Sequence, residues 1–372
     1  MMRNIAVIGC TGSIGVQSLE VLARHPQDFR VALLCCESNR ELLLQQAAAH
    51  PRAALFLRAH PDHPALEGRG LSGIRAVLDM ISGPDIDDVL VAASGFAGAQ
   101  YALAAAEAGK RVLLANKETL VCAGDMFWQA IERGGGECVP IDSEHSAIFQ
   151  CLGGRDAAQV DQLMLTCSGG PFYGWPREKL DKVTFDMTQR HPTWNMGWKI
   201  TLDSATLFNK GMELLEAVSL FSLPPEKVEI VVHPQSILHS AVMYHDGSVV
   251  GQMGYPDMKM PIHVSLFWPR RVPSGLPKFS FAKDMTFGEP DEKAFPCLPL
   301  AREAAALTGG GLTYNAAGEV TAAAFRAGQI AFQSIGTLTE RALQTPPGPA
   351  RDFQDLTQQD QQIRAMVQSW IG

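Results

Sequence analysis

The chain has 372 residues, enough for two to three domains at roughly 150 residues each. Hydrophobic residues make up 46% and charged residues 19%, which allows a sizeable core and excludes an intrinsically disordered chain. The net charge of −8 argues against a nucleic-acid-binding protein. None of the 8 cysteines forms a C-x-x-C pair, so we expect reduced thiols in a cytoplasmic protein. We expect no membrane span, because a span needs about 20 steadily apolar residues.

Residues 1–148 alternate short apolar runs with helical patterns. A strand at 4–8, a glycine turn at 9–15, a helix and a second strand at 31–36 make a βαβ unit within about 30 residues. Further strands at 89–93 and 111–115 flank a helix at 99–108. This alternation predicts an α/β fold whose N-terminal domain is a Rossmann-like, doubly wound parallel sheet.

The remaining chain divides into three predicted parts. Residues 149–267 hold strand-like runs at 162–167, 228–233, 240–244 and 248–253, and indicate a central, mostly antiparallel α/β domain. Residues 268–293 are rich in proline and typical of a connecting arm. Residues 294–372 predict a small C-terminal helical domain, with helices at 300–307, 316–327, 336–343 and 356–371.

The glycine turn has the sequence pattern Gly9-x-x-Gly12-x-x-Gly15. Small residues let the backbone approach a pyrophosphate, and the following helix offers its N-terminal N–H groups to the anion. The first spacing differs from the usual G-x-G-x-x-G, and a tight turn without a ligand is the alternative. The turn therefore indicates dinucleotide binding with moderate specificity.

The end of the second strand should select the dinucleotide. Glu37 stands there, and an acid at this place usually bonds the ribose of NAD and repels the extra phosphate of NADP. Arg40, three residues later, could attract that phosphate. These residues taken alone slightly favour NAD.

Two carboxylates lie close together in sequence, at Asp142 and Glu144. If this stretch is extended, both side chains point to one side, and their hard oxygens suit Mg²⁺ or Mn²⁺. The alternative is a strand end with two solvated acids. Glu213 offers a third acid, and His145 adjoins the pair.

Residues 166–216 collect groups that suit a phosphate ligand. The small residues at 166–171 follow a strand and could form an anion-binding nest, and Lys199, Ser204, Asn209 and Lys210 add donors. The segment 191–198, with two indoles, suits a closing loop that excludes water. A plain turn, surface charge and core packing are the alternatives for each feature, and their crowding favours the functional interpretation.

Together these motifs resemble the 1-deoxy-D-xylulose 5-phosphate reductoisomerase family. The resemblance runs in order from the N-terminus to about residue 325, through residues 9–15, 114–118, 142–145, 168–172, 191–194, 203–206, 209–211, 233–236 and 256–258, with Lys199 and Glu213. It implies rearrangement of 1-deoxy-D-xylulose 5-phosphate and its reduction to 2-C-methyl-D-erythritol 4-phosphate, in the non-mevalonate isoprenoid pathway. It also implies NADPH, Mg²⁺ or Mn²⁺, and a homodimer of three-part subunits.

The resemblance also implies residue roles. The metal ligands would be Asp142, Glu144 and Glu213, and Lys117 would lie between nicotinamide and substrate, with His145 beside the acid pair as a further catalytic group. Substrate contacts would come from Ser143, Ser168, His191, Trp194, Ser204, Asn209 and Lys210. Dinucleotide contacts would come from Thr11, Gly12, Ser13, Ile14, Asn116 and Glu118, and we expect Asn39 and Arg40 to select NADPH despite Glu37.

Two other functions remain open at this point. An ordinary NAD(P)-dependent sugar-phosphate or semialdehyde dehydrogenase would need no carboxylate metal site, so replacing Asp142 would be almost silent. A non-catalytic, dinucleotide-sensing scaffold would bind the dinucleotide without turnover, and Lys117 would be dispensable.

Overall fold

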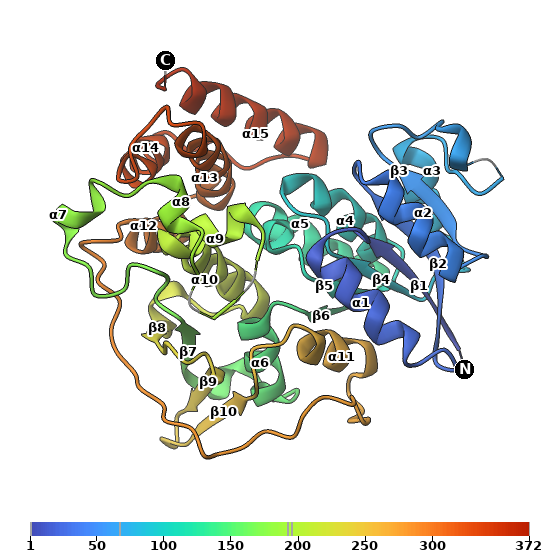
Figure 1. The fold of residues 1–372 in the computed structure, drawn as a ribbon, viewed down its shortest axis with the longest axis horizontal. Helices are drawn as coiled ribbons and strands as arrows, with labels where there is room; N and C mark the ends of the chain where they lie inside the picture. Colours follow the sequence, from blue (N-terminus) through green and yellow to red (C-terminus); the bar gives the residue numbers. More distant parts are fainter. Residues whose placement is uncertain (1, 67, 192, 195, 372) are drawn as a thin grey trace. The chain divides into compact units, whose positions relative to one another are not determined.

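The computed structural model describes residues 2–66, 68–191, 193–194 and 196–371 (Figure 1). The chain forms two compact units, each assembled from separate stretches of sequence. The first contains Met1–Thr119, Asp125–Ser146 and Asp257–Pro277, and the second contains Leu120–Gly124, Ala147–Pro256 and Lys278–Gly372. These units are coarser than the four segments expected from sequence.

A six-stranded parallel sheet forms the centre of the first unit (Figure 1). Its strand order is β3 (Ala54–Leu57), β2 (Phe29–Cys36), β1 (Arg3–Ile8), β4 (Asp88–Val91), β5 (Arg111–Leu114) and β6 (Glu137–Pro140). The central strands are continuous apolar runs because helices cover both faces of such a sheet. The order reverses between β1 and β4, where doubly wound sheets bind their ligands. The predicted Rossmann-like fold is confirmed.

Helices of the first unit pack on this sheet and on one another. They are α1 (Ser13–Ala23), α2 (Arg40–Ala49), α3 (Gly73–Ser82), α4 (Ala99–Glu107) and α5 (Lys117–Gly134) apart from its segment Leu120–Gly124. One more helix, α11 (Lys259–Phe267), packs against α1 although it lies far along the chain. Lys259 Nζ pairs with Glu20 Oε2 at 2.6 Å, and the rings of His25 and Phe267 meet at 4.7 Å. The sequence pattern predicts residues 259–267 to lie in the central domain, because a local pattern does not show which distant helix covers an apolar face.

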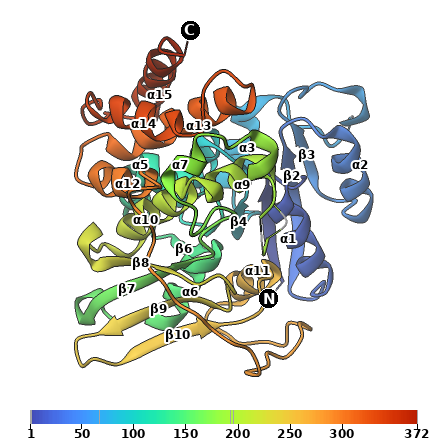
Figure 2. The ribbon, with the colours of Figure 1, turned by 60° about the vertical axis from the view of Figure 1, so that its left-hand side comes forward.

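A four-stranded mixed sheet lies in the second unit (Figure 2). Its order is β10 (Val249–Met253), β9 (Leu238–Tyr244), β7 (Val160–Cys167) and β8 (Val228–Val232). β7 runs parallel to β8 and antiparallel to β9, and β9 and β10 form a hairpin. Two of the three strand pairs are therefore antiparallel, in agreement with the mostly antiparallel α/β domain predicted for this region.

Helices complete the second unit. Those before the arm are α6 (Ser143–Leu152), which begins in the first unit, α7 (Arg177–Leu180), α8 (Phe185–Thr188), α9 (Trp198–Ala205) and α10 (Phe208–Phe221). Those after it are α12 (Cys297–Ala305), α13 (Gly310–Arg326), α14 (Ser334–Leu343) and α15 (Phe353–Gln368). Phe208 of α10 stacks on Tyr314 of α13 at 4.1 Å, and one apolar cluster continues from Ile148 to Leu343. Helices α12, α13 and α14 thus share a core with the sheet of this unit.

Two composition-based expectations can be compared with this fold. None of the eight cysteines, all of them within the described residues, is in a disulfide, and six are buried. In the part of the chain that the structure describes, no helix combines the length and the apolar character needed to cross a bilayer.

Candidate active site

The glycine turn joins β1 to α1 at the switch point of the parallel sheet. Gly9 has a φ of +83°, and a Cβ added there would lie 2.5 Å from the carbonyl carbon of Ala92. A Cβ on Gly15 would lie 2.2 Å from the carbonyl oxygen of Gly9. Gly12 is the N-cap residue of α1, and among the described residues no side chain accepts a hydrogen bond from the first N–H groups of this helix. The turn is therefore built only for glycine, and it leaves a helix N-terminus uncapped beside Thr11, Ser13 and Ile14, as a pyrophosphate site requires.

Glu37, Asn39 and Arg40 follow β2 at the same end of the sheet. Asn39 caps α2, because its Oδ1 accepts from the backbone N–H of Leu42 at 3.2 Å. Glu37 Oε2 pairs with Arg58 Nη1 at 3.0 Å, and Arg40 Nη1 lies 3.0 Å from His63 Nε2. Sequence reasoning did not identify Arg58 or His63, although Arg58 directly follows a strand that pairs with β2.

Asn116 and Glu118 hold a loop in place. The Nδ2 of Asn116, which is buried, donates to the carbonyl oxygens of Ala93 and Gly95 at 2.8 and 3.0 Å and to Glu118 Oε2 at 2.7 Å. Glu118 Oε1 accepts from the backbone N–H of Gly95 at 2.9 Å. These bonds fix the chain that follows β4, at the sheet edge where the dinucleotide turn also lies.

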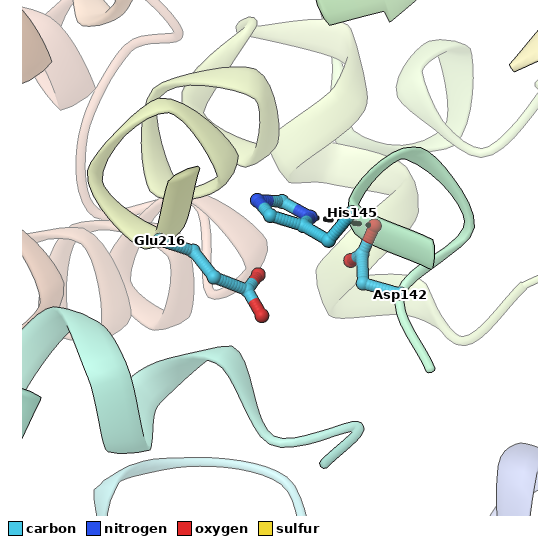
Figure 3. A group of neighbouring side chains, drawn as sticks. All are labelled: Asp142, His145 and Glu216. Carbon is cyan, nitrogen blue, oxygen red and sulfur yellow. Dashed lines mark ion pairs between the residues drawn. The ribbon is translucent and has the colours of Figure 1, made fainter. Parts of the chain in front are cut away.

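Lys117 and Asp142 form an ion pair at the ends of two neighbouring strands. Lys117 begins α5 just after β5, and Asp142 lies between β6 and α6. The Nζ and Oδ2 atoms are 2.9 Å apart, and each side chain is 12% exposed. The second oxygen of Asp142 lies 3.3 Å from Nδ1 of the fully buried His145 (Figure 3).

The electrostatic surroundings keep Asp142 ionised. Burial raises the pKa of this carboxyl group, but the charge of Lys117 and the hydrogen bond with His145 outweigh burial and hold the pKa well below its ordinary value. Asp142 is thus a carboxylate in the folded protein, which is the form that binds metal ions.

The acid pair is not extended, contrary to the geometry considered from sequence. Residues 143–152 are helical, so Glu144 lies in the first turn of α6, where its charge is favourable to the helix dipole. Ser143 Oγ donates to Glu144 Oε2. Strand β6 ends at Pro140, two residues before Asp142, and α6 begins at Ser143.

In the second unit, three predicted phosphate ligands converge. His191 Nε2 lies 3.0 Å from Ser168 Oγ and 3.1 Å from Ser204 Oγ. Ser168 also accepts from the backbone N–H of Gly170 at 3.2 Å. Gly170 has a φ of +70°, and a Cβ there would lie 2.6 Å from the carbonyl oxygen of Ser204. The glycine therefore allows the turn after β7 to approach the end of α9.

Hydrogen bonds determine the tautomer of His191. Its Nδ1 accepts from the backbone N–H groups of Thr193 and Trp194, at 3.1 and 2.9 Å. Burial lowers the pKa of His191, so the ring is neutral at pH 7 and carries its hydrogen on Nε2. Trp194 belongs to the predicted closing loop, of which Pro192 and Asn195 lie outside the described residues.

Asn209, Lys210 and Glu213 lie together on the first turns of α10. Lys210 Nζ donates to the carbonyl oxygen of Thr166 at 2.6 Å and to Glu213 Oε2, and Asn209 Nδ2 donates to Glu213 Oε1. Lys210 and Glu213 are both buried. Glu216, one turn further along α10 and labelled in Figure 3, is a buried acid that sequence reasoning missed. Its spacing of three residues from Glu213 is the signal that could have revealed it.

The fold and these side chains define a class of protein: a dinucleotide-binding α/β enzyme with carboxylates suited to a divalent cation. Comparison with known proteins then gives the family. The family model of 1-deoxy-D-xylulose 5-phosphate reductoisomerase matches residues 5–124, and two models of its C-terminal domains match residues 138–221 and 253–366. The chain belongs to the 1-deoxy-D-xylulose 5-phosphate reductoisomerase family, as its motifs predict.

Curated relatives of that name match nearly full length. The protein from Pelotomaculum thermopropionicum is 45% identical, with 92% of each chain covered. That from Methylococcus capsulatus is 42% identical, with 100% of this chain and 99% of the relative covered. Two solved structures of this family superpose with TM-scores of 0.92 and cover 100% of this chain. One holds NADPH, fosmidomycin and magnesium and is 33% identical, and the other, from Zymomonas mobilis, holds NADPH and is 36% identical.

Proposed function

We propose that this chain converts 1-deoxy-D-xylulose 5-phosphate into 2-C-methyl-D-erythritol 4-phosphate, with NADPH as the reductant and Mg²⁺ or Mn²⁺ as the metal ion. Family membership over nearly the whole chain, joined to the buried Lys117–Asp142–His145 arrangement, is the observation that carries this proposal. An ordinary dehydrogenase is less well supported, because it has no use for a buried carboxylate kept ionised beside other acids.

The metal ion would be held by Asp142, Glu144 and Glu213. Each of these three acids can offer a carboxylate oxygen to a cation. Oxygen donors are what Mg²⁺ and Mn²⁺ prefer. The bound ion would polarise the oxygens of the substrate as a Lewis acid. Lys117 would share the carboxylate of Asp142 and present its ammonium group to the substrate, and Ser143 would orient Glu144.

The phosphate end of the substrate would bind at Ser168, His191 and Ser204, with Asn209 and Lys210 nearby in the same unit. Because His191 donates through Nε2, the two serine hydroxyls keep their own protons for an acceptor oxygen. A phosphate group offers several acceptors and no obligatory donor, so this set of donors suits it. The loop that carries Trp194 would then exclude water from the reacting centre.

The dinucleotide would lie over the glycine turn, where any Cβ on Gly9 or Gly15 would overlap backbone atoms. The open first turn of α1, with Thr11, Gly12, Ser13 and Ile14, would receive the pyrophosphate. Asn116 and Glu118 would shape the nicotinamide side through their bonds to the loop after β4.

The active form would be a cytoplasmic homodimer. Among the described strands, β10 pairs with β9 on one side only, and it exposes Val249 and Val250, which are 53% and 40% accessible. Such an edge invites pairing with another chain. Eight cysteines outside any disulfide suit a reducing compartment.

The decisive experiment measures NADPH oxidation by the purified chain with 1-deoxy-D-xylulose 5-phosphate, with and without a divalent cation. We expect turnover only with both substrate and metal, and complete loss on chelation. Asp142→Asn should lower kcat/KM by at least about 100-fold and weaken Mg²⁺ binding, because a charged donor becomes neutral. Asp161→Asn, at an exposed aspartate of the second unit, is the matched control. Turnover without metal, or a fully active Asp142→Asn variant, would contradict the proposal.

A further inference from the structure

Glu37 stands where an acid ordinarily discriminates against NADP, yet its charge is compensated. The backbone hydrogen bonds between β2 and β3 continue past the ends of both strands. The backbone N–H of Arg58 donates to the carbonyl oxygen of Cys36 at 3.0 Å, and the backbone N–H of Ala59 donates to the carbonyl oxygen of Glu37 at 2.8 Å. This pairing holds Arg58 beside Glu37, where their side chains form an ion pair of 3.0 Å.

Arg58 neutralises Glu37 and still has hydrogen-bond donors to offer. Only its Nη1 donates to the carboxylate, and a guanidinium group has five N–H donors in a planar fork. The side chain is about half exposed, so the fork is accessible from solvent. The hydrogen bond with Glu37 raises the pKa of Arg58, so the guanidinium group keeps its charge. An incoming phosphate therefore meets an ion pair without net charge that still presents N–H donors.

A second pair of donors lies at the same end of the sheet. His63 Nδ1 accepts from the backbone N–H of Ala65 at 3.1 Å, while its Nε2 lies 3.0 Å from Arg40 Nη1. A neutral imidazole accepts at one ring nitrogen only. With Nδ1 as the acceptor, Nε2 carries a hydrogen and faces an N–H of the guanidinium group. Both groups thus present N–H donors at this point, and an anionic oxygen that approaches beside them would accept from both.

We propose that Arg40, Arg58 and His63 form a phosphomonoester subsite for the 2′-phosphate of NADPH, and that Arg58 cancels the discrimination expected from Glu37. Arg40 comes from the first turn of α2, and Arg58 and His63 come from the chain after β3, so the subsite joins two neighbouring strand ends. The inference deepens the proposed function, because it rests on NADPH as the dinucleotide. It assigns roles to Arg58 and His63, which the motif comparison did not select.

Equilibrium binding to the full-length protein, without turnover, tests this subsite. Calorimetric titrations would use 2′,5′-ADP and 5′-AMP, which differ in the 2′-phosphate, together with NADPH and NADH. We expect the wild type to bind 2′,5′-ADP about 10- to 100-fold more tightly than 5′-AMP, since hydrogen bonds to charged groups contribute on that scale. Arg58→Ala should remove most of this ratio, because it deletes a cation and leaves Glu37 to repel the phosphate.

Further variants separate the contributions. His63→Ala should lower affinity for 2′,5′-ADP about tenfold without changing that for 5′-AMP. Adding Glu37→Gln to Arg58→Ala should restore part of the ratio, because the repelling charge is then gone. Arg52→Ala, at an exposed arginine outside the subsite, is the control for general loss of positive charge.

The outcomes distinguish the subsite from the function itself. An unchanged ratio in both Arg58→Ala and His63→Ala, with melting temperatures like the wild type, would overturn the subsite while leaving NADPH binding intact. Failure of the wild type to bind any of the four nucleotides would overturn the proposed function as well.

Discussion

Single residues in this site act through the partners that the fold gives them. Asp142 has a cation on one carboxylate oxygen and an imidazole on the other, at 2.9 and 3.3 Å. His191 has its tautomer fixed by two backbone N–H groups. The sequence identified these residues as candidates, but only the structure shows the partners that set their protonation, which are Lys117 for Asp142 and the backbone N–H groups of Thr193 and Trp194 for His191.

His239 gives a prediction at this scale. It is buried on β9, where burial and the nearby His233 lower the pKa of His239 to about 4 despite a backbone hydrogen bond with Tyr255. The unfolded chain therefore binds a proton near pH 6.5 that the folded chain does not bind until about pH 4. The free energy of unfolding should fall across this window, by up to about 3 kcal/mol from His239, and lose nothing more from it below pH 4.

Urea denaturation of the wild type and of His239→Gln between pH 7 and pH 4 measures this effect. The variant should show a shallower loss of stability on acidification. His245→Gln, at an exposed histidine of the same unit, should retain the wild-type slope. A titration of the His239 imidazole by NMR with a midpoint near 6.5 would refute the prediction.

Two helices of the second unit pack closely at a glycine, where no side chain separates them. On α13, a Cβ at Gly318 would lie 1.9 Å from Cζ of Phe208, whose ring stacks on Tyr314. We predict that Gly318→Ala destabilises the second unit by about 1–3 kcal/mol, because the ring has no room to move within a filled core. Gly348→Ala, where a Cβ meets nothing within 4 Å, should be neutral or slightly stabilising.

Thermal and urea unfolding of the two variants provide the comparison. The prediction requires that Gly318→Ala lower the urea midpoint clearly while Gly348→Ala does not. Equal midpoints would show that α10 and α13 adjust their spacing without cost.

The sequence predicted elements well where the pattern was long and periodic. The strands that form β1, β7 and β9, and the helix α4, fall within a few residues of their expected bounds. The acid pair failed this test: its i, i+2 spacing suggested a strand, but Ser143 begins a helix. Two residues of spacing carry too little information to separate a strand end from a helix start.

At the scale of the whole molecule, the exposed edge of β10 predicts the oligomeric state. We expect a dimer by sedimentation or light scattering, and Val250→Lys should shift it towards monomer, because a charged side chain on an edge strand opposes pairing. Leu307→Lys makes the same change at another exposed apolar residue and should leave the dimer intact. A monomeric wild type, or a Val250→Lys variant that remains dimeric at low concentration, would contradict the proposal.

The sequence by itself determined the class of fold and the chemistry. A βαβ pattern with a glycine turn, and the ordered motifs that follow it, specify a family because each is local in the chain. Only the tertiary structure decided which charged side chains form ion pairs. Lys117 reaches Asp142 because β5 and β6 are neighbours, and Arg58 reaches Glu37 because β3 pairs with β2. The order of the strands in the sheet brings such groups within a few ångströms of each other. This order cannot be deduced from the spacing of residues along the chain.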